Sequence, residues 1–101
     1  MKISKHFNST NCIFTIKVKG NFDFSAIQEF KDAYMEHSDE IELYRIDLEK
    51  STYIDTAALG ILCNLRKHAA DINSEIEIIN CCPDVIKIIQ LSRLNELMKV
   101  Q

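Results

Sequence analysis

An aspartate followed by a threonine, Asp55-Thr56, is the pair of side chains in this sequence best placed to do chemistry. The pair follows an apolar run, residues 43–48, and opens a helical pattern that continues to Ile72. An aspartate or threonine at the start of a helix can cap it by accepting a hydrogen bond from a backbone N–H one turn in. The remaining N–H groups and the positive end of the helix dipole favour a negative group there. The Thr56 hydroxyl is therefore well placed to carry a phosphate, and its alternative role is that of a helix cap.

Other chemistries find little support in the sequence. An enzyme needs a nucleophile with a base, a carboxylate pair or a metal, and no His or Lys adjoins the Asp55-Thr56 pair. The two glycines, Gly20 and Gly60, cannot form a glycine-rich phosphate-binding loop. The four cysteines (12, 63, 81, 82) and three histidines (6, 37, 68) lack the spacing of a disulfide framework, a redox pair or a metal site. We therefore expect no catalytic residues, no metal and no cofactor, with reduced structural thiols and surface histidines.

Composition and charge restrict the class of partner. The 101 residues suit one domain, residues 1–101, and 47% apolar with 27% charged residues is ordinary for a globular chain. A net charge of -3 indicates neither nucleic-acid binding nor direct binding to an anionic membrane. No apolar run approaches the roughly 20 residues of a membrane span, and the N-terminal residues lack a secretory apolar stretch. A cytoplasmic protein is the expectation.

The first half of the chain predicts two strands, a helix and a central strand. Residues 1–7 and 12–19 read as a hairpin with a polar turn at 8–11. A capping box at Ser25 and Gln28, or a cap at Asp23, opens a helix to about His37. Residues 43–48 are apolar enough for a strand covered on both faces. Two charged residues in that run, Arg45 and Asp47, should be paired or near an end.

The second half predicts helices around another strand. A core-facing stripe follows Asp55 on residues 58, 61, 62, 65, 69 and 72, and residues 75–79 alternate as a strand does. Pro83 suits the first turn of a helix, whose buried side continues through Ile86, Ile89 and Gln90 or Leu91. Residues 94–100 form a terminal turn or a last short strand. Strands alternating with helices predict an α/β layer sandwich with a mixed sheet of four to five strands and about four helices.

Several motifs in order resemble the STAS domain, the fold of anti-sigma factor antagonists. The stretch Asp55-Thr56-Ala57-Ala58-Leu59-Gly60 is similar to that family's Asp-Ser-Ser-Gly-Leu-Gly, with Ala57 and Ala58 in place of a small polar residue and a glycine. Residues 20–23, Gly-Asn-Phe-Asp, resemble the family's Gly-x-Leu-Asp, residues 46–48 its central strand, and residues 83–94 its last long helix and closing turn. The resemblance covers nearly the whole chain and implies a STAS-like fold.

The resemblance also implies a function and a site. In such partner-switching systems the unmodified domain binds an anti-sigma factor, a serine kinase of ATPase fold, and phosphorylation breaks the contact. Thr56 falls where the family carries its phosphorylated residue, and a phosphatase would then reverse the modification. Asp23 and Asp55 would flank the switch, and three residues of the following helix, Ala57, Leu59 and Gly60, would shape the contact.

Two other functions remain open at this point. Asp55-Thr56-Ala57-Ala58-Leu59 also resembles the small STAS subunit of a bacterial lipid-transport ABC complex, where the threonine contacts the ATPase subunit without being a known kinase target. The third possibility is a constitutive scaffold in which Thr56 only caps a helix. The first two predict a nucleotide-binding protein partner, and they differ in whether Thr56 is modified.

Overall fold

The N-terminal residues form a β-hairpin. The computed structural model describes residues 2–36 and 40–101, in which β1 (Ile3–Asn8) pairs antiparallel with β2 (Ile13–Lys19). The alternation predicted for the second strand is confirmed, because Phe14, Ile16 and Val18 are buried while the side chains between them are not. The predicted start of the first strand at Met1 lies outside the described residues.

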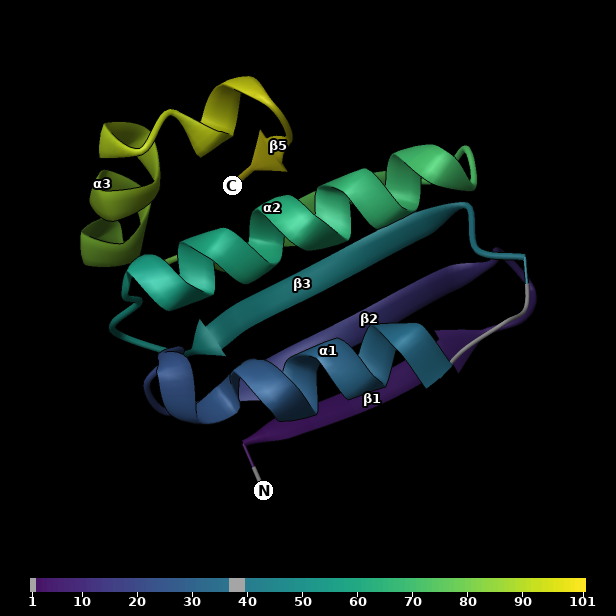
Figure 1. The fold of residues 1–101 in the computed structure, drawn as a ribbon, viewed down its shortest axis with the longest axis horizontal. Coiled ribbons are helices and arrows are strands. Elements are labelled where there is room, and N and C mark those ends of the chain that lie inside the picture. The colour runs from purple at the N-terminus through teal and green to yellow at the C-terminus, as the bar shows by residue number, and fades with distance from the viewer. Residues whose placement is uncertain (1, 37–39) are drawn as a thin grey trace.

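Three further strands extend the hairpin into one sheet. They are β3 (Leu43–Lys50), β4 (Glu75–Ile79) and β5 (Lys99–Val100), each parallel to its neighbour, in the order β1-β2-β3-β4-β5. The connections carry α1 (Ile27–Glu36), α2 (Thr56–Asp71) and α3 (Pro83–Leu91), with short 3₁₀ helices η1 (Phe24–Ala26) and η2 (Leu94–Glu96) (Figure 1). The α/β fold and the mixed five-stranded sheet are confirmed. Within residues 2–36 and 40–101 there are three α-helices, slightly fewer than the four or so expected, and the predicted end of α1 at His37 lies outside that range.

The helices cover only one face of the sheet. From β2 onward every connection steps to the next strand in the same direction, and right-handed crossovers that step the same way place their helices on the same side. Figure 1 accordingly shows α1 and α2 in front of the strands. On the other face Leu43, Arg45 and Asp47 of β3 remain partly exposed, so the prediction that this strand is covered on both sides is wrong.

Arg45 and Asp47 of β3 both have polar partners, as expected. The Nε of Arg45 lies 2.6 Å from an Oε of Glu77 on β4, directly opposite in the ladder. The Oδ1 of Asp47 accepts hydrogen bonds from the Asn80 side-chain amide at 3.1 Å and from the Glu49 N–H at 2.9 Å. These polar contacts thus lie on the face of the sheet that α1 and α2 do not cover.

The core lies between the sheet and the helices. The predicted stripe of α2 is confirmed at Ala58, Ile61, Leu62, Leu65 and Ala69, which are all buried. Ile72, the last member of the predicted stripe, follows the end of the helix and is 45% exposed. On α3 the buried residues are Val85 and Ile89, whereas Gln90 is exposed and Leu91 is 78% exposed. Ile72, Gln90 and Leu91 all lie at the C-terminal end of a helix, where the chain turns away from the sheet.

The four cysteines and His68 are partly buried. All four cysteines are free and partly buried. His6 is exposed, but the His68 ring packs 5.2 Å from that of Tyr34 and 6.0 Å from that of Tyr44, so its prediction as a surface residue is wrong. His37 is outside the described residues. Across the described ranges no three His, Cys, Asp or Glu side chains gather as a metal site would require, and no helix there is long and apolar enough to cross a membrane.

Candidate functional site

The predicted site residues meet where β2 and β3 end. Because these strands are parallel, their carboxyl ends reach the same edge of the sheet. The chain segments that follow them are joined by an isolated bridge between Phe22 and Ile54. Its backbone hydrogen bonds run from the Phe22 N–H to the Tyr53 carbonyl at 2.9 Å and from the Asp55 N–H to the Phe22 carbonyl at 3.2 Å. The bridge holds Asp23 and Asp55, 32 positions apart in the sequence numbering, beside the same edge.

Asp55 is the N-cap of α2. Its Oδ1 accepts from the Ala58 N–H at 2.9 Å, and its backbone is extended, as an N-cap requires. Its Oδ2 accepts from the Phe24 N–H of η1 at 3.2 Å. One carboxylate therefore caps the helix that begins at Thr56 and also anchors the loop after β2.

Thr56 is the first residue of α2 and its side chain is exposed. Because Asp55 provides the cap, the predicted alternative in which Thr56 caps the helix does not apply. The Thr56 hydroxyl forms no hydrogen bond to any part of the chain that the structure describes. It stands at the positive end of a helix of 16 residues, an environment that favours an attached negative group.

Asp23 belongs to a small polar network next to Asp55. Its Oδ1 accepts from the Ser25 N–H at 3.0 Å, from the Ser25 hydroxyl, and from the Lys2 ammonium at 3.4 Å. Lys2 also donates to the Ser25 hydroxyl at 2.7 Å. The Ser25 hydroxyl has the largest effect on the pKa of the Asp23 carboxyl and lowers it. Desolvation, the next largest effect, raises the pKa, but the Ser25 N–H and Lys2 lower it further, so it lies below its ordinary value. Asp23 caps η1, and the capping box predicted at Ser25 and Gln28 does not form, since the Ser25 N–H donates to Asp23 and not to the Gln28 side chain.

The remaining predicted site residues lie on the first two turns of α2. Thr56 and Gly60 are both exposed and share one stripe of the helix, four positions apart. Ala57 is half-buried, and Leu59 packs partly against the core. Apart from its chain neighbours and the nearby backbone of its own helix, a Cβ added at Gly60 would have no heavy atom of the described residues within 4 Å, so packing within the chain does not require a glycine there.

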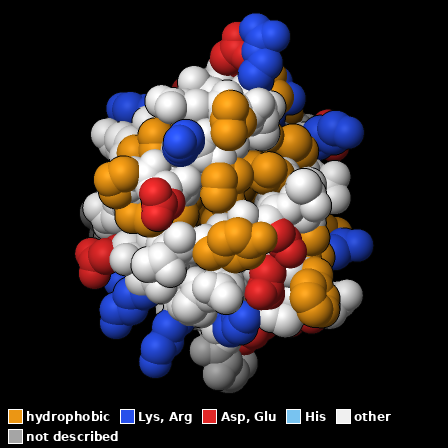
Figure 2. All heavy atoms as spheres, turned by 90° about the vertical axis from the view of Figure 1, so that its left-hand side faces the viewer, with side chains coloured by type: hydrophobic (Ala, Val, Ile, Leu, Met, Phe, Trp, Pro, Cys, Tyr) orange, Lys and Arg blue, Asp and Glu red, His pale blue; other side chains and the backbone are white. Residues whose placement is uncertain are grey.

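Two aromatic residues at this edge were not assigned a role from the sequence. Phe24 is 77% exposed and directly follows Asp23, a predicted site residue. Tyr53 is 49% exposed and directly precedes the buried Ile54. Figure 2 shows the face that carries this edge, with hydrophobic side chains across its middle and charged ones mostly around them. A signal was present in the sequence: Phe24 adjoins Asp23, and Tyr53 stands two residues before Asp55.

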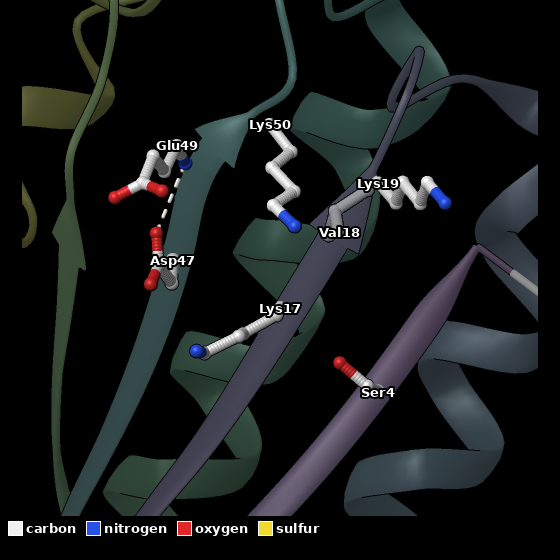
Figure 3. Close-up of a pocket in the computed structure, with 7 residues that line it drawn as sticks. All are labelled: Ser4, Lys17, Val18, Lys19, Asp47, Glu49 and Lys50. Atoms are coloured by element: carbon white, nitrogen blue, oxygen red, sulfur yellow. Dashed lines mark hydrogen bonds between the residues drawn. The ribbon is translucent and has the colours of Figure 1, made fainter.

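A separate hollow of about 160 Å³ lies on the open face of the sheet (Figure 3). It is lined by residues from β1, β2 and β3 and contains none of the predicted site residues: Ser4, Lys17, Val18, Lys19, Asp47, Glu49 and Lys50. Figure 3 shows lysines and carboxylates side by side around it, so the hollow favours neither an anion nor a cation. It is a solvated part of the sheet face.

Comparison with known sequences identifies one family. A family model described as STAS domain matches residues 3–101. A STAS-domain containing protein from Pseudomonas aeruginosa (strain UCBPP-PA14) is 43% identical to the chain over 86 residues, which span 85% of each protein. The residues matched by the family model include the strands and helices that form the site.

Solved structures share the fold. A protein of Thermotoga maritima described as a candidate anti-sigma factor antagonist has a TM-score of 0.84 at 13% identity, covering 97% of this chain and 84% of that one. A sulfate transporter family protein from Wolinella succinogenes has a TM-score of 0.83 at 10% identity, covering 95% and 80%. The anti-sigma factor antagonist SpoIIAA in its unphosphorylated form has a TM-score of 0.79 at 16% identity, covering 98% and 87%. At such identities the likeness establishes the fold, and the function has to be argued from the site.

Proposed function

Because the chain belongs to the STAS domain family, we propose that it acts as one domain in the manner of an anti-sigma factor antagonist. In this role it is a cytoplasmic binding protein that switches partners and carries out no catalysis itself. Its partner is an anti-sigma factor that is also a serine kinase of ATPase fold, and Thr56 is the residue that the kinase modifies. A phosphatase completes the cycle by restoring the hydroxyl.

The observation that supports this proposal most directly is the division of labour between Asp55 and Thr56. Asp55 caps α2 through Oδ1 and anchors η1 through Oδ2, while the Thr56 hydroxyl is exposed and has no hydrogen bond within residues 2–36 and 40–101. A threonine that the fold does not use is available to a kinase. Its exposed neighbour on the same stripe, Gly60, leaves room for a partner to approach the helix closely.

Phosphorylation at Thr56 would act on the interface and not on the fold. The phosphate adds about two negative charges next to Asp55 and the Asp23 network. The only cation with a described contact in that network, Lys2, is already engaged by Asp23 and Ser25. Because a helix N-terminus tolerates a phosphate well, α2 should stay folded. In the middle of the contact the phosphate would lose its hydration and would stand beside Asp55, so desolvation and like-charge repulsion oppose binding.

Calorimetry with purified proteins tests the proposal. The chain is titrated with each ATPase-fold anti-sigma kinase encoded in the same genome. We expect wild type and Thr56→Ser to bind alike and Thr56→Glu to bind at least roughly tenfold more weakly. Incubation with the kinase and MgATP should place a phosphate on Thr56, located by peptide mass spectrometry, and Thr56→Ala should remain unmodified.

Other outcomes discriminate between functions. If no such kinase bound the wild-type chain, the antagonist role would be wrong. Binding to the ATPase subunit of an ABC transporter, with Thr56 unmodified and Thr56→Ala impaired, would assign the chain to the lipid-transport reading instead.

A further inference from the structure

Asp55 uses both of its carboxylate oxygens within the chain. Oδ1 accepts from the Ala58 N–H at 2.9 Å, and Oδ2 accepts from the Phe24 N–H at 3.2 Å. The residue is half-buried. The motif in the sequence predicts that Asp55 flanks the switch, but its described contacts are all with the chain itself.

Oδ2 holds the exposed part of the loop that follows β2. This part is residues 23–25, which are partly or fully exposed and lie between two fully buried neighbours. Within the part of the chain that the structure describes, hydrogen bonds tie these residues to distant segments at two places. Lys2 donates to two of their side chains, and Asp55 accepts from the Phe24 N–H. Asp55 is therefore the described hydrogen-bonded link between this loop and α2.

We propose that Asp55 is a positioning residue of the partner interface, which acts by holding the loop of Asp23 in place and does not itself touch the partner. The inference rests on the proposed function, since it concerns the contact at that same site. It assigns different roles to two aspartates that the sequence motifs treat alike.

Asp23 has the unused oxygen that Asp55 lacks. Its side chain is 21% exposed, and its described hydrogen bonds, from Ser25 and Lys2, all reach Oδ1. Oδ2 accepts none within the described residues, so it can accept from a hydrogen-bond donor of the partner. A loop that is already held in its bound position loses less conformational freedom on binding. The residue that holds it thereby contributes to affinity.

Asparagine at position 55 separates the two uses of the carboxylate. Asparagine is about as good an N-cap as aspartate, so its amide oxygen can keep the bond to the Ala58 N–H. Its NH₂ group then faces the Phe24 N–H, and two donors form no hydrogen bond. Asp55→Asn therefore releases the loop and leaves the cap of α2 in place. Asp55→Ser, whose one oxygen serves the cap, is a second variant of the same kind.

Asp71 provides a matched control. It is the last residue of the same helix and is exposed. Asp71→Asn makes the same chemical change roughly 20 Å away along the helix, where it leaves the loop after β2 untouched. Any effect of lost charge alone should appear in both asparagine variants.

The test combines hydrogen exchange of the free chain with binding to, and phosphorylation by, the kinase that binds the wild type. In Asp55→Asn the Phe24 amide should exchange faster than in the wild type, while the Ala58 amide stays protected. Asp55→Asn should weaken binding by roughly fivefold and raise the KM for phosphorylation of Thr56 by a similar factor, with kcat unchanged. Asp71→Asn should match the wild type in each measurement.

A double-mutant cycle identifies the route by which Asp55 acts. Asp23→Ser keeps an oxygen that can cap η1 but removes the carboxylate, and it should weaken binding by roughly fivefold. Since Asp55 acts through Asp23, adding Asp55→Asn to Asp23→Ser should change the affinity by less than about twofold. Losses that multiply would show that Asp55 touches the partner itself, and would overturn the proposal.

The remaining outcomes separate the inference from the function on which it rests. A wild-type chain that bound no kinase would overturn both. A wild-type chain that bound, with Asp55→Asn binding as tightly as Asp71→Asn, or Asp23→Ser as tightly as the wild type, would overturn the positioning role and leave the switch at Thr56 standing. A fall in kcat in Asp55→Asn would also overturn it, because Asp55 would then act on the reaction itself.

Discussion

Asp55 and Thr56 are adjacent, but only the Asp55 side chain forms hydrogen bonds with the described residues. The carboxylate accepts from Ala58 on its own helix and from Phe24 on a loop 31 positions earlier, so it serves the fold twice. The Thr56 hydroxyl forms no hydrogen bond within the residues that the structure describes. From the sequence, the position of the pair at a helix start could be predicted, but which of the two capped the helix could not. Both residue types make good caps, and the choice depends on where the loop from β2 approaches.

At Gly60 the stability of the helix and the proposed partner contact favour different residues. Glycine inside a helix is less stable than alanine by about 0.5–1 kcal/mol, and a methyl group there would meet no described atom within 4 Å beyond its chain neighbours and the nearby backbone of its own helix. We therefore expect Gly60→Ala to raise the free energy of unfolding by about that amount in urea denaturation. The same variant should bind the partner more weakly, because a methyl group would intrude on the exposed stripe shared with Thr56. Stabilisation without loss of affinity would show that the partner does not approach this turn closely.

Asp23 should make stability depend on pH in the acid range. Its folded pKa lies below the ordinary 3.8, chiefly because of the Ser25 hydroxyl, so in that range the unfolded chain binds more protons. The stabilising effect is present above the unfolded pKa and is lost as the pH falls through the folded value. The stability difference between wild type and Asp23→Asn, measured by urea denaturation, should therefore shrink as the pH is lowered below about 4. Ser25→Ala should reduce this pH dependence more than Lys2→Met does, and the opposite order would contradict the assigned cause.

The elements show what periodicity can and cannot predict. Alternation in β2 and the stripe in α2 were predicted correctly, because each pattern reports the face that its own element turns to the core. The open face of the sheet was missed, because Leu43 and the buried residues of β3 together look like a strand covered on both sides. Coverage depends on the direction in which successive crossovers step, a property of the whole sheet that no single strand encodes.

The Arg45–Glu77 ion pair joins β3 to β4 on the face of the sheet that α1 and α2 leave uncovered. Glu77 is largely buried, with a side chain 12% exposed, so Arg45→Ala would leave its carboxylate without its partner. We expect Arg45→Ala to lower the free energy of unfolding by about 1–3 kcal/mol, measured by urea denaturation. Replacing both residues, as Arg45→Met with Glu77→Leu, should recover most of the loss.

A second arginine supplies the control for this prediction. Arg93 pairs with Glu96 on the surface, with side chains 78% and 52% exposed. Arg93→Ala should cost no more than about 0.5 kcal/mol, because exposed ion pairs contribute little. Equal losses at Arg45 and Arg93 would mean that the buried position of Glu77 has no energetic weight.

At the scale of the whole molecule, the order of the strand and helix patterns predicted the α/β fold and the mixed sheet. The family motifs selected Asp23 and Asp55, which the structure brings to one edge through the Phe22–Ile54 bridge. They did not indicate Phe24 or Tyr53, whose exposure depends on how the two loops are joined and not on their composition. The contact of His68 with two tyrosines was missed for the same reason, since it joins α2 to residues of α1 and β3.

The strand order has a consequence for how the molecule can assemble. Along the sheet the strands follow one another as they do along the chain, so no strand has to be inserted between two that are already paired. A chain growing from a ribosome could therefore add each strand to the outer edge of the last, beginning with the hairpin of β1 and β2. The Phe22–Ile54 bridge and the cap at Asp55 need nothing beyond the first turn of α2. The residues proposed to meet the partner, which lie within 23–60, would then all be present in the growing chain before β4 is synthesised.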